Sequence, residues 1–443
     1  MWFALFITAF FGLFQYRIYK QMHALPVVFN LWWVCIIIMF IATRDNYYDI
    51  TTAVWTYIII GNIAINIASL FYKGAIGEKS FSFGSFLKQT DVEDVIWVNV
   101  GNKIYIVQFI FFIVMIPLLI KALPTVLSGG FGTIRQVYVG VGGEAFMTTI
   151  ERIIYIHFIV FPGVTACNLI QANLWSKGLM PLRKMWIAIL NVGVITIITG
   201  ARTWLFSLVI YMLAAYLINS SFVKKLSTKE YKRIRRNILL IILVSFFAFV
   251  FITSQRSMGY GRTTRENFID TISVYFTGGI KLFDLTLSSP TSFGLMDRMH
   301  GLSFIGGLLS VFQLILMYIP GIGSFFYGDL ISNQVQQFVT GYYAIGKSVS
   351  MNAFPTMYYY FMRDFGVLGI LFGGCVFGWL ITWATTRSRR NNIHFSLIYC
   401  ICMYLVIFSV CWWDPYRMEF WTIIIQVLFW EYYARRKSQV RGY

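Results

Sequence analysis

The chain has 443 residues, of which 58% are hydrophobic, 19% are aromatic and only 12% are charged. A soluble domain carries about 25% charged residues, so the composition excludes an ordinary soluble globular protein. A net charge of +18 would favour nucleic-acid binding in a soluble protein. In a membrane protein the cytoplasmic excess of lysine and arginine explains much of it, and we expect no nucleic-acid partner.

Long apolar runs predict about eleven membrane-spanning helices in one all-α, polytopic membrane protein. A helix needs about 20 residues to cross a bilayer, and several runs reach this length alone or with their Tyr, Trp and Asn flanks. Runs that stay apolar exclude a β-barrel, whose strands alternate apolar and polar residues. The predicted spans are Trp2–Phe14, Leu25–Ala42, Val54–Tyr72, Ile104–Ile120, Ile153–Cys167, Met185–Thr199, Leu205–Ile218, Ile238–Thr253, Leu371–Ala384, Phe395–Trp413 and Phe420–Trp430.

Basic clusters orient these spans. The densest cluster lies between Lys224 and Arg236, and the tail from Arg435 to Arg441 carries another. Because cytoplasmic loops are enriched in Lys and Arg, the N-terminus is predicted outside and the C-terminus inside. The segment Lys121–Glu151 is then an outer loop. Residues 1–443 contain no linker or internal repeat and predict a single transmembrane domain.

The longest outer segment, residues 254–354, includes two apolar stretches, Phe268–Phe283 and Leu302–Ile319. The chain must cross the membrane an odd number of times between Thr253 and Arg387, and the helix near Thr356–Ala384 already supplies one crossing. These two stretches are therefore either re-entrant or interfacial, or both cross. Non-helical backbone at membrane depth is tolerated only where protein or a water-filled cavity covers it. A loop of this kind usually builds a site, and we expect one here.

Arginines on the outer side run against the positive-inside rule, so they are candidate ligands for an anion. Arg256 and Arg262 flank Gly259 and Gly261, where backbone N–H groups can approach an anion closely. Arginine matches phosphate in a bidentate fork. The loop is therefore either a diphosphate site or a solvated surface.

Two more arginines join this set. Arg202 lies in a tight outer turn between two apolar runs, where it either reaches back to the interface or faces a cavity. Arg135 is a weaker member of the same set.

Asp364 is the candidate general base. Pro355 can start a helix, which would place Asp364 about 14 Å into it and would require a partner or water for the carboxylate. Asp364 is either a base with a raised pKa or half of a structural ion pair with Arg202 or Arg363. His300 and Asp284, in the long outer segment, are alternative bases.

Metal and nucleotide sites are not predicted. The six cysteines form no CxxC pair, the four histidines are scattered, and no HExxH or P-loop sequence occurs. No cofactor is expected.

Three stretches in a fixed order resemble a known family. They are Thr199–Thr203 (Thr-Gly-Ala-Arg-Thr), Tyr275–Asp284 (Tyr-Phe-Thr-Gly-Gly-Ile-Lys-Leu-Phe-Asp), and Asn352–Thr356 (Asn-Ala-Phe-Pro-Thr) followed by Arg363–Gly369. Together they resemble the Wzy-type polymerases of oligosaccharide repeat units in bacterial O-antigen and capsule synthesis. The resemblance covers roughly Ile195 to Leu380.

The resemblance implies a GT-C-like glycosyltransferase in the bacterial inner membrane. Such an enzyme transfers a growing glycan from undecaprenyl diphosphate to a new lipid-linked repeat unit at the periplasmic face, without nucleotide or metal. Its partners would be the undecaprenyl-diphosphate-linked oligosaccharide and membrane lipid, and a chain-length regulator is an open question.

The residue roles that follow are also expectations. They assign diphosphate binding to Arg202, Arg256, Arg262 and Arg135, catalysis to Asp364 and His300, and glycan binding to Asn352, Tyr359 and Asp284. Relatives often carry an amide where Asp284 lies, which leaves its catalytic use in doubt. Two alternatives stay open: a lipid-linked oligosaccharide flippase or other transporter, and an O-antigen ligase.

Overall fold

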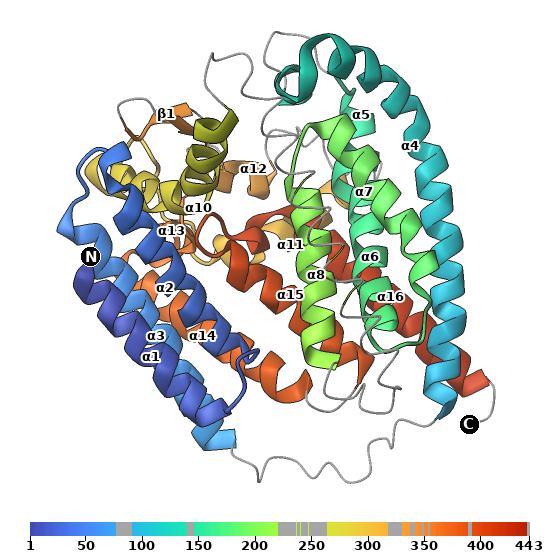
Figure 1. Cartoon of the computed structure of the whole chain (residues 1–443), viewed down its shortest axis with the longest axis horizontal. Helices are drawn as coiled ribbons and strands as arrows, with labels where there is room; N and C mark the ends of the chain where they lie inside the picture. Colours follow the sequence, from blue (N-terminus) through green and yellow to red (C-terminus); the bar gives the residue numbers. More distant parts are fainter. Residues whose placement is uncertain are drawn as a thin grey trace. The chain divides into compact units, whose positions relative to one another are not determined.

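The computed structural model describes residues 1–76, 91–139, 146–219, 236, 240, 247, 264–317, 330–336, 342–346, 350–352, 355–388 and 392–440. Helices dominate this part of the chain, and one antiparallel strand pair accompanies them (Figure 1). Seven of the described helices are long and apolar enough to cross a membrane, and three shorter ones are also apolar. These helices agree with the predicted all-α polytopic class.

Contacts within the chain divide it into two units. The first unit combines Met1–Gly84, Asp270–Arg387 and Cys402–Trp421, and the second combines Ser85–Ile269, Ser388–Ile401 and Thr422–Tyr443. The prediction of one transmembrane domain stays a prediction.

The first unit combines helices from the N-terminal part of the chain with helices from its C-terminal half. Its elements are α1 (Trp2–Tyr19), α2 (Leu25–Thr43), η1 (Arg44–Asn46), α3 (Thr52–Ile76), most of α10 (Thr264–Ser288), α11 (Leu302–Leu316), α12 (Ile331–Gln336), β1 (Tyr342–Ala344), β2 (Ser350–Asn352), α13 (Met357–Phe365), α14 (Val367–Ser388) and η8 (Asp414–Tyr416). β1 and β2 pair with Tyr343 opposite Met351.

The second unit contains the longest helix. Its elements are α4 (Asp91–Val139), α5 (Thr149–Arg152), the π-helical turn η2 (Ile153–Phe158), α6 (Val160–Ser176), η3 (Leu182–Lys184), α7 (Trp186–Thr199), α8 (Thr203–Asn219), the first part of α15 (Ile393–Phe408) and most of α16 (Met418–Val440). Figure 1 shows α4 running along the green helices α6 and α7.

Glycines let α3 and α14 approach at backbone distance in the first unit, where the two helices lie side by side (Figure 1). A Cβ on Gly378 would lie 2.2 Å from the carbonyl oxygen of Ile65, and one on Gly374 would lie 3.1 Å from that of Gly61. Small residues at such contacts let membrane helices gain van der Waals contact where lipid gives no hydrophobic drive.

Buried amides connect the first three helices. The side chains of Asn30 and Asn66 exchange hydrogen bonds of 2.8 and 3.0 Å, and the Gln15 amide donates to Asn66 Oδ1 at 3.2 Å. All three side chains are fully buried. Because an unpaired polar group is costly in lipid, these bonds fix how α1, α2 and α3 align.

The lipid-facing side of α4 can be read from its exposed residues. Ile106, Ile113, Ile120 and Leu127 follow one another at seven-residue intervals and are all at least half exposed. At 1.5 Å per residue this stripe is about 32 Å long, which matches the roughly 30 Å hydrocarbon thickness of a bilayer.

Within the predicted outer segment Lys121–Glu151, the chain is helical up to Val139, and the outward placement of this segment stays a prediction. The helix continues past Lys121, whose ammonium group donates to the carbonyl oxygen of Phe146. The helical geometry is interrupted only at Gly130 (φ 73°, ψ −175°), and α4 ends at Val139.

α11 is too short to cross a bilayer alone. Its 15 residues extend about 22 Å, against a hydrocarbon thickness of roughly 30 Å. Its buried face is small and polar, whereas its exposed face is apolar, which is typical of a helix with lipid on one side. The buried residues include Ser303, Gly306, Gly307 and Ser310, and the exposed ones Ile305, Phe312 and Ile315.

Whether the two apolar stretches of the long outer segment cross the membrane stays a prediction, as does the number of eleven spans. The stretch Phe268–Phe283 lies within α10. The predicted span Ile238–Thr253 lies outside the described residues, apart from positions 240 and 247.

The contact at Gly378 gives a stability test. We expect Gly378→Ala to lower the thermal unfolding midpoint of the purified protein in detergent, because the added methyl group must displace the Ile65 carbonyl. Overpacking of this kind costs about 1–3 kcal/mol. Gly193→Ala in α7 is the matched control, since a Cβ there has nothing within 4 Å and alanine favours a helix by about 1 kcal/mol. Equal midpoints for the two variants would contradict the close approach.

Candidate functional site

The α7–α8 turn brings two predicted phosphate-binding arginines to one corner of the second unit. Gly200 ends α7 in the left-handed conformation (φ 59°). A Cβ on it would lie 2.9 Å from the carbonyl oxygen of Phe131 and 3.1 Å from the Cβ of Arg135. Arg202 follows two residues later, with a side chain only 9% exposed. The backbone of Arg135 therefore lies beside Gly200, two positions before Arg202.

Aromatic residues line the same corner. The Arg135 guanidinium lies 5.5 Å from the centre of the Tyr138 ring, within the range of a cation–π interaction. Trp204 packs edge-on against Phe161, with ring centres 5.6 Å apart. Guanidinium groups held beside apolar surface interact strongly with phosphate, because little water screens them.

This corner lies beyond one end of the lipid-facing stripe on α4. Arg135 follows Leu127, the last residue of the stripe, by eight positions. At the opposite end, Lys103 bonds the Tyr433 hydroxyl and Lys184 bonds the Asn102 side chain. The apolar stripe therefore has Arg135 beyond one end and the two lysines, Lys103 and Lys184, beyond the other.

The π-helical turn η2 packs on the same apolar cluster as Ile134 and Phe131. A π-helix frees carbonyl groups from the regular ladder, and here α16 satisfies them. Thr422 donates to the His157 carbonyl at 2.9 Å and Gln426 to the Phe158 carbonyl at 2.8 Å. Such turns are frequent at functional sites, so the π-helical turn is a second feature of this corner that is typical of a functional site.

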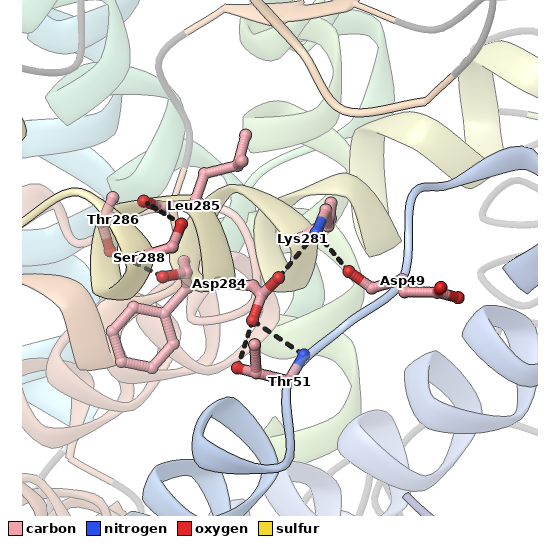
Figure 2. Close-up of polar contacts among 8 residues, drawn as sticks. Asp49, Thr51, Lys281, Asp284, Leu285, Thr286 and Ser288 are labelled. Carbon is pink, nitrogen blue, oxygen red and sulfur yellow. Dashed lines mark hydrogen bonds and ion pairs between the residues drawn. The ribbon is translucent and has the colours of Figure 1, made fainter.

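Asp284 belongs to a buried polar cluster in the first unit (Figure 2). Its carboxylate lies 2.6 Å from the Lys281 ammonium, one turn earlier on α10, and both side chains are at most 5% exposed. Thr51 donates to Asp284 through its backbone N–H at 3.0 Å and its hydroxyl at 2.5 Å, and Lys281 also donates to the Asp49 carbonyl at 2.6 Å. The pair thus ties α10 to the segment that precedes α3.

Asp364 is buried at the end of α13 and caps another helix. Its Oδ1 accepts the Ser303 N–H at 3.2 Å, in the first turn of α11, while its Oδ2 is buried with no hydrogen bond. A carboxylate is favourable at a helix N-terminus. Burial raises the pKa of this carboxyl, which lies outside the candidate spans, to about 6 against the lowering effect of the Ser303 hydrogen bonds.

Arg363, the neighbour of Asp364, is held by backbone carbonyls. Its guanidinium donates to the carbonyl of Gly294 at 3.2 Å and to that of Val335. The other proposed partner, Arg202, lies in the second unit, and pairing with it stays a prediction. The Ser303 bond gives Asp364 a capping role, and its catalytic role also stays a prediction.

His300 and Asp364 are adjacent through the backbone, since the His300 N–H donates to the Asp364 carbonyl at 3.3 Å. The imidazole is exposed, and its centre lies 6.0 Å from that of the Phe365 ring. His300 has a left-handed backbone (φ 49°), which is uncommon for a residue with a side chain and clusters at functional sites. Of the two predicted bases, His300 is the one accessible from outside.

The predicted glycan ligands differ in position. Tyr359 is fully buried and its hydroxyl donates to the Phe293 carbonyl at 2.8 Å, so packing explains this side chain. Asn352 lies in β2 opposite Tyr342. Arg256 and Arg262 lie outside the described residues. Sugar or phosphate binding by these residues stays a prediction.

Sequence reasoning did not single out the charged group at η8. Arg417 lies 3.3 Å from Asp414 and 3.6 Å from Glu419, and the Trp412 indole donates to Asp414 at 2.9 Å. The signal was present as a three-residue spacing, which Lys281 and Asp284 share. Such spacing places opposite charges on one face of a helical turn.

No protein-family model, curated protein or solved structure matches the chain. The functional assignment therefore depends on the residues themselves.

The Lys281–Asp284 pair predicts a strong response to charge removal. Asp284→Asn leaves the Lys281 ammonium buried without a counter-charge, and breaking such a pair costs about 3–5 kcal/mol. We expect a clear drop in the thermal unfolding midpoint. Asp45→Asn is the control, because Asp45 is 95% exposed in its 3.4 Å pair with Arg44. Adding Lys281→Met to Asp284→Asn should recover part of the loss; a double variant as unstable as the sum of the singles would contradict the coupling.

The raised pKa of Asp364 predicts a pH dependence of stability. Between pH 3.8 and about 6 the folded protein holds a proton that the unfolded chain releases, so stability falls as pH rises through this window. The full effect is about 3 kcal/mol. Asp364→Asn removes it while keeping an acceptor for Ser303. We therefore expect the wild type to lose stability relative to Asp364→Asn between pH 4 and 7 in thermal unfolding. A constant difference over that range would refute the shift.

Proposed function

We propose that the chain is a membrane-embedded glycosyltransferase that polymerises lipid-linked oligosaccharide repeat units. The growing glycan leaves undecaprenyl diphosphate and is joined to an incoming repeat unit on a second undecaprenyl diphosphate. The observation that supports this most is the close approach of Arg135 to Gly200, which lies two positions before Arg202. The three stretches that resemble the Wzy-type polymerases include this same turn.

Arginine chemistry suits the leaving group of this reaction. An acceptor hydroxyl oxygen bonds to the anomeric carbon as the bond from that carbon to the diphosphate oxygen breaks. Negative charge then grows on the diphosphate, and positioned guanidinium groups stabilise it. The hydroxyl proton needs an acceptor, for which His300 and Asp364 stay the candidates.

Location and sidedness are part of the proposal. The chain lies in the inner membrane of a bacterium, with its N-terminus in the periplasm and its C-terminus in the cytoplasm. Lys103 and Lys184 beyond one end of the α4 stripe, together with the basic C-terminal tail, favour that end as the cytoplasmic one. The Arg135–Arg202 corner is then periplasmic.

Two other functions remain distinguishable by experiment. A flippase would move the lipid-linked unit without forming a bond, and an O-antigen ligase would join the glycan to a lipid core. Deleting the gene should leave a single repeat unit on the lipid core when surface polysaccharide is run on a gel. A deletion strain with no repeat unit at all would favour a flippase or ligase instead.

Arg202→Ala and Arg135→Ala test the proposed diphosphate site. Loss of one stabilising donor typically lowers a rate about 100-fold or more, so the deletion strain complemented with either variant should make mainly single repeat units. Arg183→Ala, an exposed arginine of η3, is the matched control and should restore full-length polymer. The amount of each protein in the membrane is measured by immunoblot. Full-length polymer from both arginine variants would sink the diphosphate assignment.

A further inference from the structure

We propose that the start of α14 binds an anionic phospholipid, with Arg298 at the phosphate and the exposed face of α14 along the acyl chains. This site lies within the first unit and does not depend on the proposed polymerase activity.

Arg298 is fixed at one edge and open at the other. Its Nη1 donates to the Met362 carbonyl at 2.8 Å, and its Nη2 lies 3.2 Å from the point where a Cβ on Gly366 would be. Gly366 adopts the left-handed region (φ 65°) between α13 and α14. The absence of a side chain at Gly366 thus lets the guanidinium lie against the first turn of α14. The residue remains exposed overall, so its other N–H groups can reach a phosphate.

The segment that carries Arg298 is held rigidly. The Met299 N–H donates to the Arg363 carbonyl at 3.0 Å, and the Asp297 N–H donates to the Gly294 carbonyl at 3.3 Å. Asp364 caps the helix that follows the segment. A cation on a rigid support loses little conformational freedom when it binds, which favours binding.

The exposed face of α14 begins directly after Gly366, which lies beside the Arg298 guanidinium. Leu368 is 71% exposed, Phe372 59% and Trp379 49%, and α14 is one of the candidate membrane spans. From Leu368 to Trp379 the helix rises about 16 Å, close to the roughly 15 Å that one leaflet contributes to the hydrocarbon core. The apolar face therefore has the depth of the acyl chains of one leaflet, with the arginine at the level of their headgroup.

Charge and length together select the occupant. A guanidinium with one edge free matches a single phosphate. Asp297, exposed beside Arg298, opposes a second negative charge, which argues against a diphosphate. A glycerophospholipid with one anionic phosphate and chains of one-leaflet length fits both limits.

Lipid titration of the full-length protein in detergent tests this site. Native mass spectrometry would count bound dioleoylphosphatidylglycerol and, separately, dioleoylphosphatidylcholine for the wild type and for Arg298→Gln. Glutamine keeps an N–H donor for the Met362 carbonyl but removes the charge. A surface arginine contributes about fivefold to binding of an anionic lipid, so Arg298→Gln should weaken phosphatidylglycerol binding about fivefold. The loss of affinity should shrink in high salt.

Arg44→Gln is the matched control. Arg44 is an arginine with a 64% exposed side chain just after α2, in the same unit, and its removal should leave lipid binding unchanged. Asp297→Asn should bind phosphatidylglycerol as tightly as the wild type or more tightly. The proposal is overturned if Arg298→Gln binds phosphatidylglycerol like the wild type, if Arg44→Gln loses as much affinity, or if phosphatidylcholine binds equally well. A lower unfolding midpoint of Arg298→Gln with unchanged lipid binding would make Arg298 a purely structural clamp.

Discussion

The structure depends on one constraint: a polar group in the hydrocarbon core must find its partner within the protein. In the first unit, Asn30 and Asn66 satisfy each other across two helices. In the second unit, the Gln426 side chain donates a hydrogen bond to the Phe158 carbonyl of the π-helical turn. Outside the candidate spans, Asp364 likewise accepts an N–H at the start of α11. Polar residues in this apolar chain therefore specify which helices meet.

Because of the same constraint, charged residues in different positions have different roles. Lys281 and Asp284 form a buried ion pair in which the two charges neutralise each other. The pair therefore stabilises the fold and leaves little charge for binding a ligand. Arg135 instead lies beside Gly200, in the turn that carries Arg202, and its guanidinium faces the Tyr138 ring. Arg298 is anchored at one edge and exposed at the other. The position of a charged residue therefore matters more than its type: buried pairs stabilise the fold, whereas arginines at turns and exposed sites are suited to binding phosphate.

Sequence periodicity and hydropathy predicted the helical class and most of the candidate spans, because an uninterrupted apolar run leaves the backbone few alternatives. They ended one predicted span at Ile120, whereas α4 continues through Lys121 to Val139. The meeting of Arg135 with Gly200 was also beyond sequence, since it depends on packing between segments far apart. The helix end at Ser303 that Asp364 caps was also beyond sequence, since it lies 61 positions away.

The cap on α11 has a consequence for how the protein is made. The N–H of Ser303 is satisfied by a carboxylate 61 positions later in the chain. When α11 leaves the ribosome, that carboxylate has not been synthesised, and the helix is also shorter than the bilayer is thick. The N-terminal cap of α11 is therefore completed only after α13 has been synthesised, so the final packing of α11 has to follow that of α13.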